Sequence, residues 1–180
     1  MVSCNQDYMN KCVFLDRDGV INRDRVDYAY DLSHFEMLPG VPQALAQLKK
    51  AGYLLVVVTN QSGIAKGIYT REDMETCHRF MHEQTGHVID AVYYAPYHPV
   101  KSESLTRKPD SLMFEKAIAR FGIDQANSWM VGDKERDIVP AHKLAIPSIL
   151  ISPEKSDSKA EYIVKDLTEA ARKILKTNEG

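Results

Sequence analysis

Short apolar segments alternate with amphipathic segments along most of this 180-residue chain. The second apolar segment, residues 53–58, is rich in valine and apolar throughout, which is typical of a strand covered on both faces. Regular alternation of strands and helices indicates a parallel sheet with a layer of helices on each side. The predicted strands are residues 12–15, 53–58, 91–95, 128–131 and 148–151. The predicted helices are residues 43–51, 71–84, 111–121, 137–144 and 167–175.

Length, charge and cysteine content limit the kinds of protein to consider. A single domain over residues 1–180 is the simplest organisation for a chain of this length. The net charge of −2 lacks the basic excess of nucleic-acid-binding proteins, and the longest apolar segment is too short to cross a membrane. Three widely spaced cysteines, Cys4, Cys12 and Cys77, do not suggest a disulfide framework. We therefore expect a cytoplasmic protein without a nucleic-acid or membrane partner.

An acidic pair follows the first predicted strand directly. Asp16 and Asp18 stand one residue apart after the apolar segment, and Gly19 then allows the chain to turn away. Two carboxylates this close repel each other, so a hard divalent cation is expected between or beside them. The same pattern also occurs in helix caps and turns, and the pair alone leaves that structural alternative open.

Polar residues also follow two other predicted strands. Thr59 comes directly after residues 53–58, and Asp133 comes shortly after residues 128–131. In open parallel sheets, ligands bind beyond the carboxyl ends of the strands. The positions of Asp16, Thr59 and Asp133 therefore predict one shared site at this edge of the sheet.

Four motifs together resemble one enzyme family. They read FLDRDGVIN at residues 14–22, TNQSGIAKG at 59–67, RKP at 107–109 and MVGDK at 130–134. Over residues 12–151 the chain resembles the haloacid-dehalogenase-like phosphatases. It is most similar to the branch of D-glycero-D-manno-heptose 1,7-bisphosphate 7-phosphatases and histidinol phosphatases. The resemblance implies a three-layer α/β/α sandwich with a Rossmann-like parallel sheet, strand order 5-4-1-2-3, essentially no cap domain, and a monomer.

The resemblance also implies roles for four catalytic residues, Asp16, Asp18, Thr59 and Lys108. Asp16 would attack phosphorus and form an aspartyl-phosphate, which divides one difficult step into two. Asp18 would protonate the leaving oxygen and then activate the hydrolytic water. Thr59 and Lys108 would bind the phosphoryl oxygens, the first by hydrogen bonds and the second by its charge.

Metal and substrate ligands follow from the same resemblance. Mg²⁺ would be held by Asp16, the backbone carbonyl of Asp18 and Asp133, while Asp137 is expected to orient these groups, with direct ligation left open. The implied substrate-binding residues are Asp24, Arg25, Asn60, Gln61, Ser62, Arg107 and Lys134. Arg107 suits a second phosphate because its fork binds two oxygens at once. Residues 60–62 could instead cap the following helix, and Lys134 could be a solvated loop residue.

The chain departs from the family pattern at a zinc-binding loop. Many bacterial members carry C-x-H followed by C-x-C before the RKP motif. Here the first pair aligns with Ala95 and Tyr97, and the second aligns with Ser104 and Thr106. Zinc needs about four nitrogen, sulfur or oxygen ligands, so we expect no zinc and a loop held by packing and hydrogen bonds. A separate pair, His78 and His82, lacks the glutamate of a zinc motif and is expected on a surface helix face.

Three functional hypotheses remain open at this stage. The first is a Mg²⁺-dependent phosphomonoesterase that removes the 7-phosphate of D-glycero-D-manno-heptose 1,7-bisphosphate. Histidinol-phosphate phosphatase is the second, because the motifs of the two groups overlap heavily. The third, of a different class, is a catalytically silent phosphate-binding module in the same pocket.

Overall fold

One parallel sheet organises the computed structural model, which describes residues 9–100, 103–152 and 157–177. Within these residues the sheet has six strands in the order β3-β2-β1-β4-β5-β6. The strands are β1 (Cys12–Leu15), β2 (Leu54–Asn60), β3 (Ala91–Ala95), β4 (Trp129–Gly132), β5 (Ser148–Ile151) and β6 (Tyr162–Val164). The expected order of the first five strands is confirmed. The edge strand β6 was not predicted, because three residues are too few for a periodic pattern.

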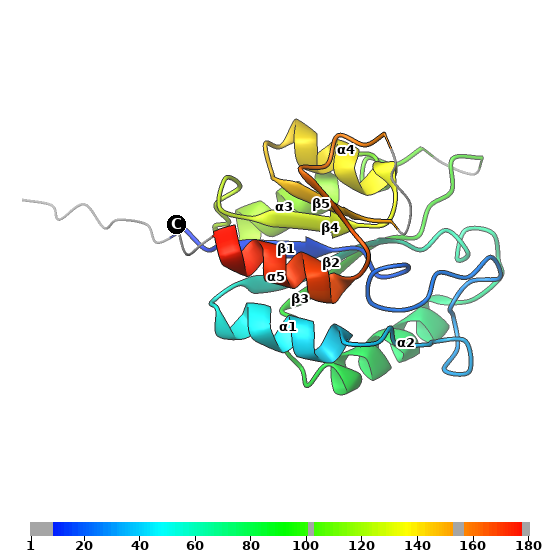
Figure 1. Cartoon of the computed structure of the whole chain (residues 1–180). Helices are drawn as coiled ribbons and strands as arrows, with labels where there is room; N and C mark the ends of the chain where they lie inside the picture. Colours follow the sequence, from blue (N-terminus) through cyan, green and yellow to red (C-terminus); the bar gives the residue numbers. More distant parts are fainter. Residues whose placement is uncertain (1–8, 101–102, 153–156, 178–180) are drawn as a thin grey trace, which may run out of the picture.

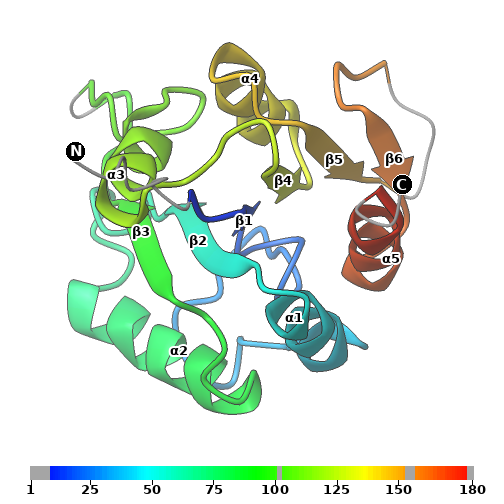
Figure 2. The same ribbon diagram turned by 90° about the vertical axis from the view of Figure 1, so that its left-hand side faces the viewer.

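Helices cover both faces of the sheet (Figure 1). They are α1 (Val41–Lys50), α2 (Arg71–Gln84), α3 (Leu112–Phe121), α4 (Glu135–Lys143) and α5 (Leu167–Thr177). Figure 2 shows α1, α2 and α5 on one face and α3 and α4 on the other. The three-layer sandwich is therefore confirmed. Each predicted helix is present, and α1 begins earlier than expected because proline is well accommodated in a first turn.

The central strand β1 separates two apolar cores. Val13 and Leu15 pack in the core beneath α1, α2 and α5, whereas Phe14 packs in the core beneath α3. All four residues of β1 are buried, as expected for a strand covered on both faces. Because β1 lies between β2 and β4, the residues that follow these three strands emerge side by side.

Loops, rather than a separate domain, cover the carboxyl edge of the sheet. Residues 16–40 connect β1 to α1, and residues 61–70 connect β2 to α2, without a further helix. This agrees with the expected lack of a large cap.

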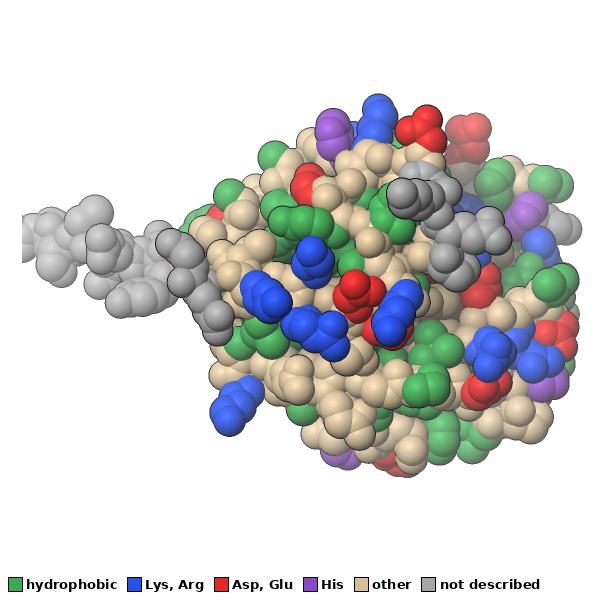
Figure 3. Space-filling model, viewed as in Figure 1, with side chains coloured by type: hydrophobic (Ala, Val, Ile, Leu, Met, Phe, Trp, Pro, Cys, Tyr) green, Lys and Arg blue, Asp and Glu red, His purple; other side chains and the backbone are tan. Residues whose placement is uncertain are grey.

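Helix α5 shows how the outer layer is partitioned between core and solvent. Leu167, Ala170 and Ile174 lie in the core beside α1. Basic side chains gather over the outer face of this helix (Figure 3), including Arg172 and Lys173.

In the part of the chain that the structure describes, no helix has the length and apolar character needed to cross a membrane. Two cysteines are buried free thiols, and Cys4 lies outside the described residues.

Candidate active site

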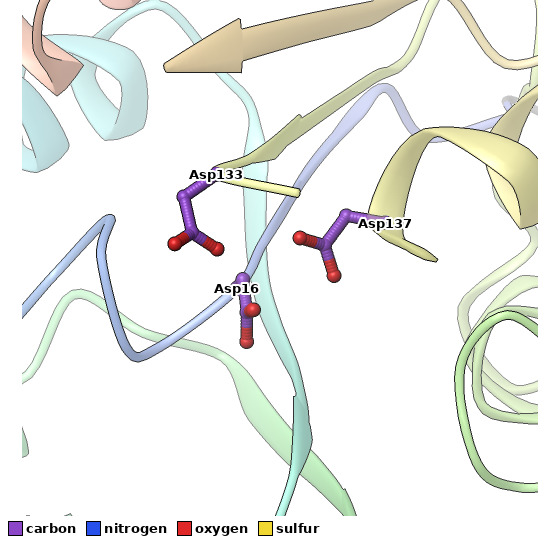
Figure 4. Close-up of side chains that lie close together, drawn as sticks. All are labelled: Asp16, Asp133 and Asp137. Carbon is purple, nitrogen blue, oxygen red and sulfur yellow. The ribbon is translucent and has the colours of Figure 1, made fainter. Parts of the chain in front are cut away.

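Three carboxylates meet at the carboxyl edge of the sheet (Figure 4). Asp16 follows β1, Asp133 follows β4, and Asp137 lies in the first turn of α4. One carboxylate oxygen from each residue lies within 4.8 Å of the others. The backbone N–H of Asp16 donates to the carbonyl of Val131 at 3.0 Å, which extends the β1–β4 pairing to the site itself.

The charge around these carboxylates suits a hard divalent cation. Burial and the neighbouring charge of Asp137 raise the pKa of Asp16 to about 7, although Lys108 acts in the opposite direction. Burial also raises the pKa of Asp133, and the Oδ1 atom of Asp133 is buried without a hydrogen-bond partner. An all-oxygen set with excess negative charge fits Mg²⁺, which prefers carboxylate and water ligands. The cluster therefore fits the expected metal.

Gly19 allows the chain to pass close to Asp133. Its φ of +84° is a left-handed conformation, and a Cβ atom at this position would overlap the Asp133 side chain. Gly86 also has a left-handed φ, of +68°, but a Cβ atom there would meet nothing within 4 Å. An alanine at either position would strain the backbone, but only an alanine at residue 19 would also displace the Asp133 carboxylate.

Gly19→Ala should weaken Mg²⁺ binding, whereas Gly86→Ala should not. Both variants force an L-residue into a left-handed conformation, which costs about 1–2 kcal/mol of stability. Only the alanine at residue 19 also displaces Asp133, so we expect its Mg²⁺ affinity to fall by about tenfold or more, comparable to the loss of a ligand-orienting contact. Isothermal titration of both variants with MgCl₂ checks this, and equal affinities would contradict it.

Lys108 is a buried cation between two of the carboxylates. Its Nζ atom lies 3.0 Å from Asp16 Oδ1 and 2.7 Å from Asp137 Oδ1, and it donates to the Val58 carbonyl at 2.6 Å. Burial alone would lower the pKa of this amine, but the charges of Asp137 and Asp16 raise it above its ordinary value. Lys108 therefore remains charged and partly offsets the acidic cluster.

Asn60 and Asp137 hold Lys108 in place. The Asn60 side chain donates to the Lys108 carbonyl and accepts from the Lys108 backbone N–H, both at 3.0 Å. Asp137 contacts the lysine through Oδ1, and its Oδ2 atom accepts from the Lys134 backbone N–H at 3.1 Å. Oδ2 of Asp137 thus accepts a hydrogen bond, whereas Oδ1 is ion-paired with Lys108 but has no hydrogen-bond partner among the described residues. Contacts with two lysines of the site argue for an orienting function.

Asp18 lies in a network of hydrogen-bond donors. Its Oδ1 atom accepts from Asn22 at 2.8 Å and from Arg17 at 2.9 Å, and its Oδ2 atom accepts from Gln61 at 3.2 Å. Burial alone would raise the pKa of Asp18, but the Arg17 charge and these hydrogen bonds hold it below its usual range. Gln61 also donates to the Thr59 hydroxyl at 2.9 Å, which links Asp18 to the end of β2.

A cavity of about 290 Å³ opens beside Asp18. All seven residues expected to bind substrate line it: Asp24, Arg25, Asn60, Gln61, Ser62, Arg107 and Lys134. Asp24 is paired with Lys134, which also contacts Asp133 at 2.8 Å. The sequence-based set therefore comes together at one opening, next to the acidic cluster.

Several residues at this opening were not predicted from the sequence. Tyr28, Lys66 and Arg136 also line the cavity, and the Lys66 amine donates to the Tyr28 hydroxyl at 2.8 Å. Burial and the nearby charge of Arg136 lower the pKa of Arg107, and the Nε atom of Arg136 is buried without a hydrogen-bond partner. The sequence contained one signal for Arg136: it stands in the first turn of a helix, where a cation opposes the helix dipole.

Hydroxyl groups meet at Ser104 and Thr106, the second of the two pairs that the sequence alignment placed at the family's zinc-binding loop. Ser104 Oγ lies 2.7 Å from Thr106 Oγ1, and the Thr106 backbone N–H also donates to Ser104 Oγ. Arg107 donates from its guanidinium to the Tyr97 carbonyl at 3.0 Å, which ties the two ends of the loop together. Hydrogen bonds therefore hold the described part of this loop.

The expected surface position of His78 is wrong. His78 is buried, and its Nε2 atom lies 3.4 Å from Arg17 Nη1. Burial, reinforced by the Arg17 charge, lowers the pKa of this imidazole to about 3, so it is neutral near pH 7. The i, i+4 spacing with His82 could not reveal this contact, because Arg17 comes from a distant loop.

A family model described as haloacid dehalogenase-like hydrolase matches residues 18–151. The chain belongs to this family. This haloacid dehalogenase-like hydrolase is 37% identical over 174 residues to D-glycero-beta-D-manno-heptose-1,7-bisphosphate 7-phosphatase of Haemophilus ducreyi. The match covers 88% of the chain and 95% of the relative. It is 43% identical over 143 residues to the protein of the same name from Vibrio cholerae, covering 74% of the chain and 76% of the relative.

A solved structure shares the fold of this hydrolase. The D,D-heptose 1,7-bisphosphate phosphatase from B. bronchiseptica, complexed with magnesium and phosphate, superposes with a TM-score of 0.83. It is 28% identical, and the match covers 93% of this chain and 99% of the other. The magnesium and phosphate of that complex agree with the chemistry that the acidic cluster and the cationic cavity can support.

Proposed function

We propose that this phosphatase uses Mg²⁺ to remove the 7-phosphate of D-glycero-D-manno-heptose 1,7-bisphosphate. One observation carries the proposal: the acidic cluster and its Lys108 partner lie next to a cavity that five cationic side chains line. Similarity to the heptose-bisphosphate phosphatases over most of the chain supports this substrate. The reaction is assigned to a single domain over residues 1–180, acting as a cytoplasmic monomer.

In the first half-reaction, Asp16 is the nucleophile. A carboxylate oxygen of Asp16 forms a bond to phosphorus while the bond from phosphorus to the sugar oxygen breaks. Asp18 gives its proton to that leaving oxygen. The incoming phosphate dianion favours the protonated form of Asp18, because a like charge nearby raises a carboxyl pKa. Lys108 and the Thr59 hydroxyl bind the phosphoryl oxygens.

In the second half-reaction, Asp18 accepts a proton from water. The water oxygen bonds to phosphorus, the bond from phosphorus to Asp16 breaks, and inorganic phosphate leaves. When bound by Asp16, the Asp18 carbonyl and Asp133, Mg²⁺ supplies positive charge that offsets repulsion between the carboxylate and the phosphoryl oxygens. No zinc is needed for this chemistry.

Cations at the cavity favour a substrate with a second phosphate. They are Arg25, Lys66, Arg107, Lys134 and Arg136. Lys134 is paired with two aspartates, whereas Arg136 is near enough to Arg107 for its like charge to lower the pKa of Arg107, so an anion bound by both would be stabilised. Histidinol phosphate carries an ammonium group in place of a second phosphate, and this surrounding disfavours it.

A substrate panel tests the proposal. We expect phosphate release with Mg²⁺ to be fastest for heptose 1,7-bisphosphate, and kcat/KM to exceed that for heptose 7-phosphate by about 10- to 100-fold, because charged hydrogen bonds contribute about 1.5–3 kcal/mol. EDTA should abolish release, and MgCl₂ should restore it. Both anomers and histidinol phosphate complete the panel.

Each contrary outcome has a distinct meaning. A preference for histidinol phosphate would contradict the proposed substrate but not the aspartyl-phosphate mechanism. Full activity in EDTA would contradict the metal assignment. Bound Mg²⁺ without hydrolysis of any phosphate ester would support the silent binding module instead.

A further inference from the structure

No step of the proposed reaction uses the buried guanidinium of Arg17. Arg17 is 2% exposed and is among the largest fully buried side chains in the described part of the chain. A buried arginine is strongly unfavourable unless its charge and its donors are matched. The partners that match it therefore indicate what this side chain does.

Two donors of Arg17 are directed at Asp18. Nη2 donates to Asp18 Oδ1 at 2.9 Å, and Nε lies 3.3 Å and 3.2 Å from the two carboxylate oxygens. This two-point contact fixes the plane of the carboxylate as well as its position. Asn22 and Gln61 reach the same carboxylate through single hydrogen bonds.

The guanidinium also binds the loop at the cavity opening. Nη2 donates to the Ala29 carbonyl at 3.0 Å, and Ala29 and Tyr28 both line the cavity. Tyr28 has a left-handed φ of +66°, a conformation that non-glycine residues adopt when the surroundings enforce it. One guanidinium nitrogen thus connects Asp18 to the segment that faces the substrate.

On the side away from Asp18, the guanidinium contacts a histidine of α2 and an aromatic ring of the core. His78 offers Nε2 at 3.4 Å from Nη1, and the Phe35 ring centroid lies 5.9 Å from the guanidinium carbon. Arg17 therefore contacts Asp18, the cavity loop and two buried residues, which together limit its movement.

We propose that Arg17 is the positioning residue for leaving-group protonation: it holds the Asp18 carboxylate and the Ala29 segment in one arrangement, at the place where the leaving oxygen departs. This inference rests on the proposed role of Asp18 as the acid and base. Replacement of Arg17 should slow the reaction most when the leaving oxygen needs a proton. Attack by Asp16 on phosphorus should be affected much less.

Leaving groups of different basicity test this position. The rate of leaving-group release in the first turnover is measured with Mg²⁺ for p-nitrophenyl phosphate, phenyl phosphate and heptose 1,7-bisphosphate, whose leaving groups become progressively more basic. This rate excludes the later hydrolysis of the aspartyl-phosphate, which is the same for all three substrates. For Arg17→Met we expect this first-turnover rate to fall about 10- to 100-fold with the heptose and less than about threefold with p-nitrophenyl phosphate, because general acid catalysis contributes about 10²–10⁴-fold. KM should change little. Arg17→Lys should recover part of the loss.

A second pair of variants keeps the guanidinium in place. His78→Leu removes the acceptor for Nη1, whereas His78→Gln retains an acceptor oxygen. We expect His78→Leu to show the same leaving-group dependence in weaker form and His78→Gln to resemble wild type. Arg79→Met, at an exposed arginine on the same helix, is the matched control.

The contrary outcomes separate this inference from the proposed function. An equal loss with every substrate would mean that Arg17 has only a structural role. If the Arg17 variants do not fold, identical behaviour of the two His78 variants would likewise overturn the inference. Asp18→Asn is measured in parallel, and if its loss does not depend on the leaving group, the proposed role of Asp18 fails first. If the protein does not hydrolyse heptose 1,7-bisphosphate, the comparison between p-nitrophenyl phosphate and phenyl phosphate decides the inference.

Discussion

Asp16→Asn should reduce phosphate release by about 10⁴-fold or more, because the amide cannot form the aspartyl-phosphate. The substitution preserves the shape of the side chain while removing its charge and nucleophilicity. Lys108 keeps its second partner, Asp137, at 2.7 Å. The variant should therefore remain folded, and initial rates with heptose 1,7-bisphosphate and p-nitrophenyl phosphate measure the loss directly.

Stability provides the control for this variant. The pKa of Asp16 is raised to about 7 in the fold, so this carboxylate makes unfolding easier as the pH rises from about 4 to above 7. In EDTA at pH 8, Asp16→Asn should consequently have a higher free energy of unfolding than wild type. Glu75→Gln, at an exposed carboxylate on α2, should leave both rate and stability unchanged. If Asp16→Asn retains most of its activity, the nucleophile is another group.

Lys108→Met should lower the free energy of unfolding by about 3–5 kcal/mol, because it leaves two buried carboxylates without their cation. Methionine has a similar length, so the loss comes mainly from charge. Activity should fall as well, since Lys108 is expected to bind the phosphoryl group. Urea denaturation in EDTA measures the stability change without compensation by a bound metal.

A double variant distinguishes charge imbalance from lost packing. Adding Asp137→Asn to Lys108→Met removes one of the unpaired charges, so part of the lost stability should return. Lys50→Met, at an exposed lysine on α1, should change stability by less than about 0.5 kcal/mol. An additive double variant would show that Lys108 and Asp137 are not coupled.

Local pattern was sufficient for most of the secondary structure. Strand β1 and its neighbours appear as apolar segments because both faces of the sheet are covered. Thr70 begins α2 with a capping box to Asp73, a short-range interaction that the sequence displays directly. Strand β6 was missed because it has only three residues, of which Val164 alone is buried, and because it pairs with β5 from a distance along the chain.

The candidate site was predictable where it depends on strand ends. Asp16 and Asp133 each follow a strand, and parallel strands end at the same edge of the sheet. Thr59 was expected just after its strand but is the last residue but one of β2, which runs two residues further than predicted. Family resemblance added the residues that line the cavity. The partners within the site were not predictable: Asn60 and Lys108 are 48 residues apart, and Arg17 and His78 are 61 residues apart.

The sequence by itself determined the alternation of strands and helices and the presence of acidic and hydroxyl residues at strand ends. These properties depend on neighbours a few residues away, through burial periodicity and turn chemistry. Only the tertiary structure decided that Asn60 binds Lys108, that His78 is buried, and that Arg17 connects Asp18 to the cavity loop. Such contacts depend on how strand order and loop paths bring distant segments together. The local sequence pattern does not indicate which distant residues will lie close in space.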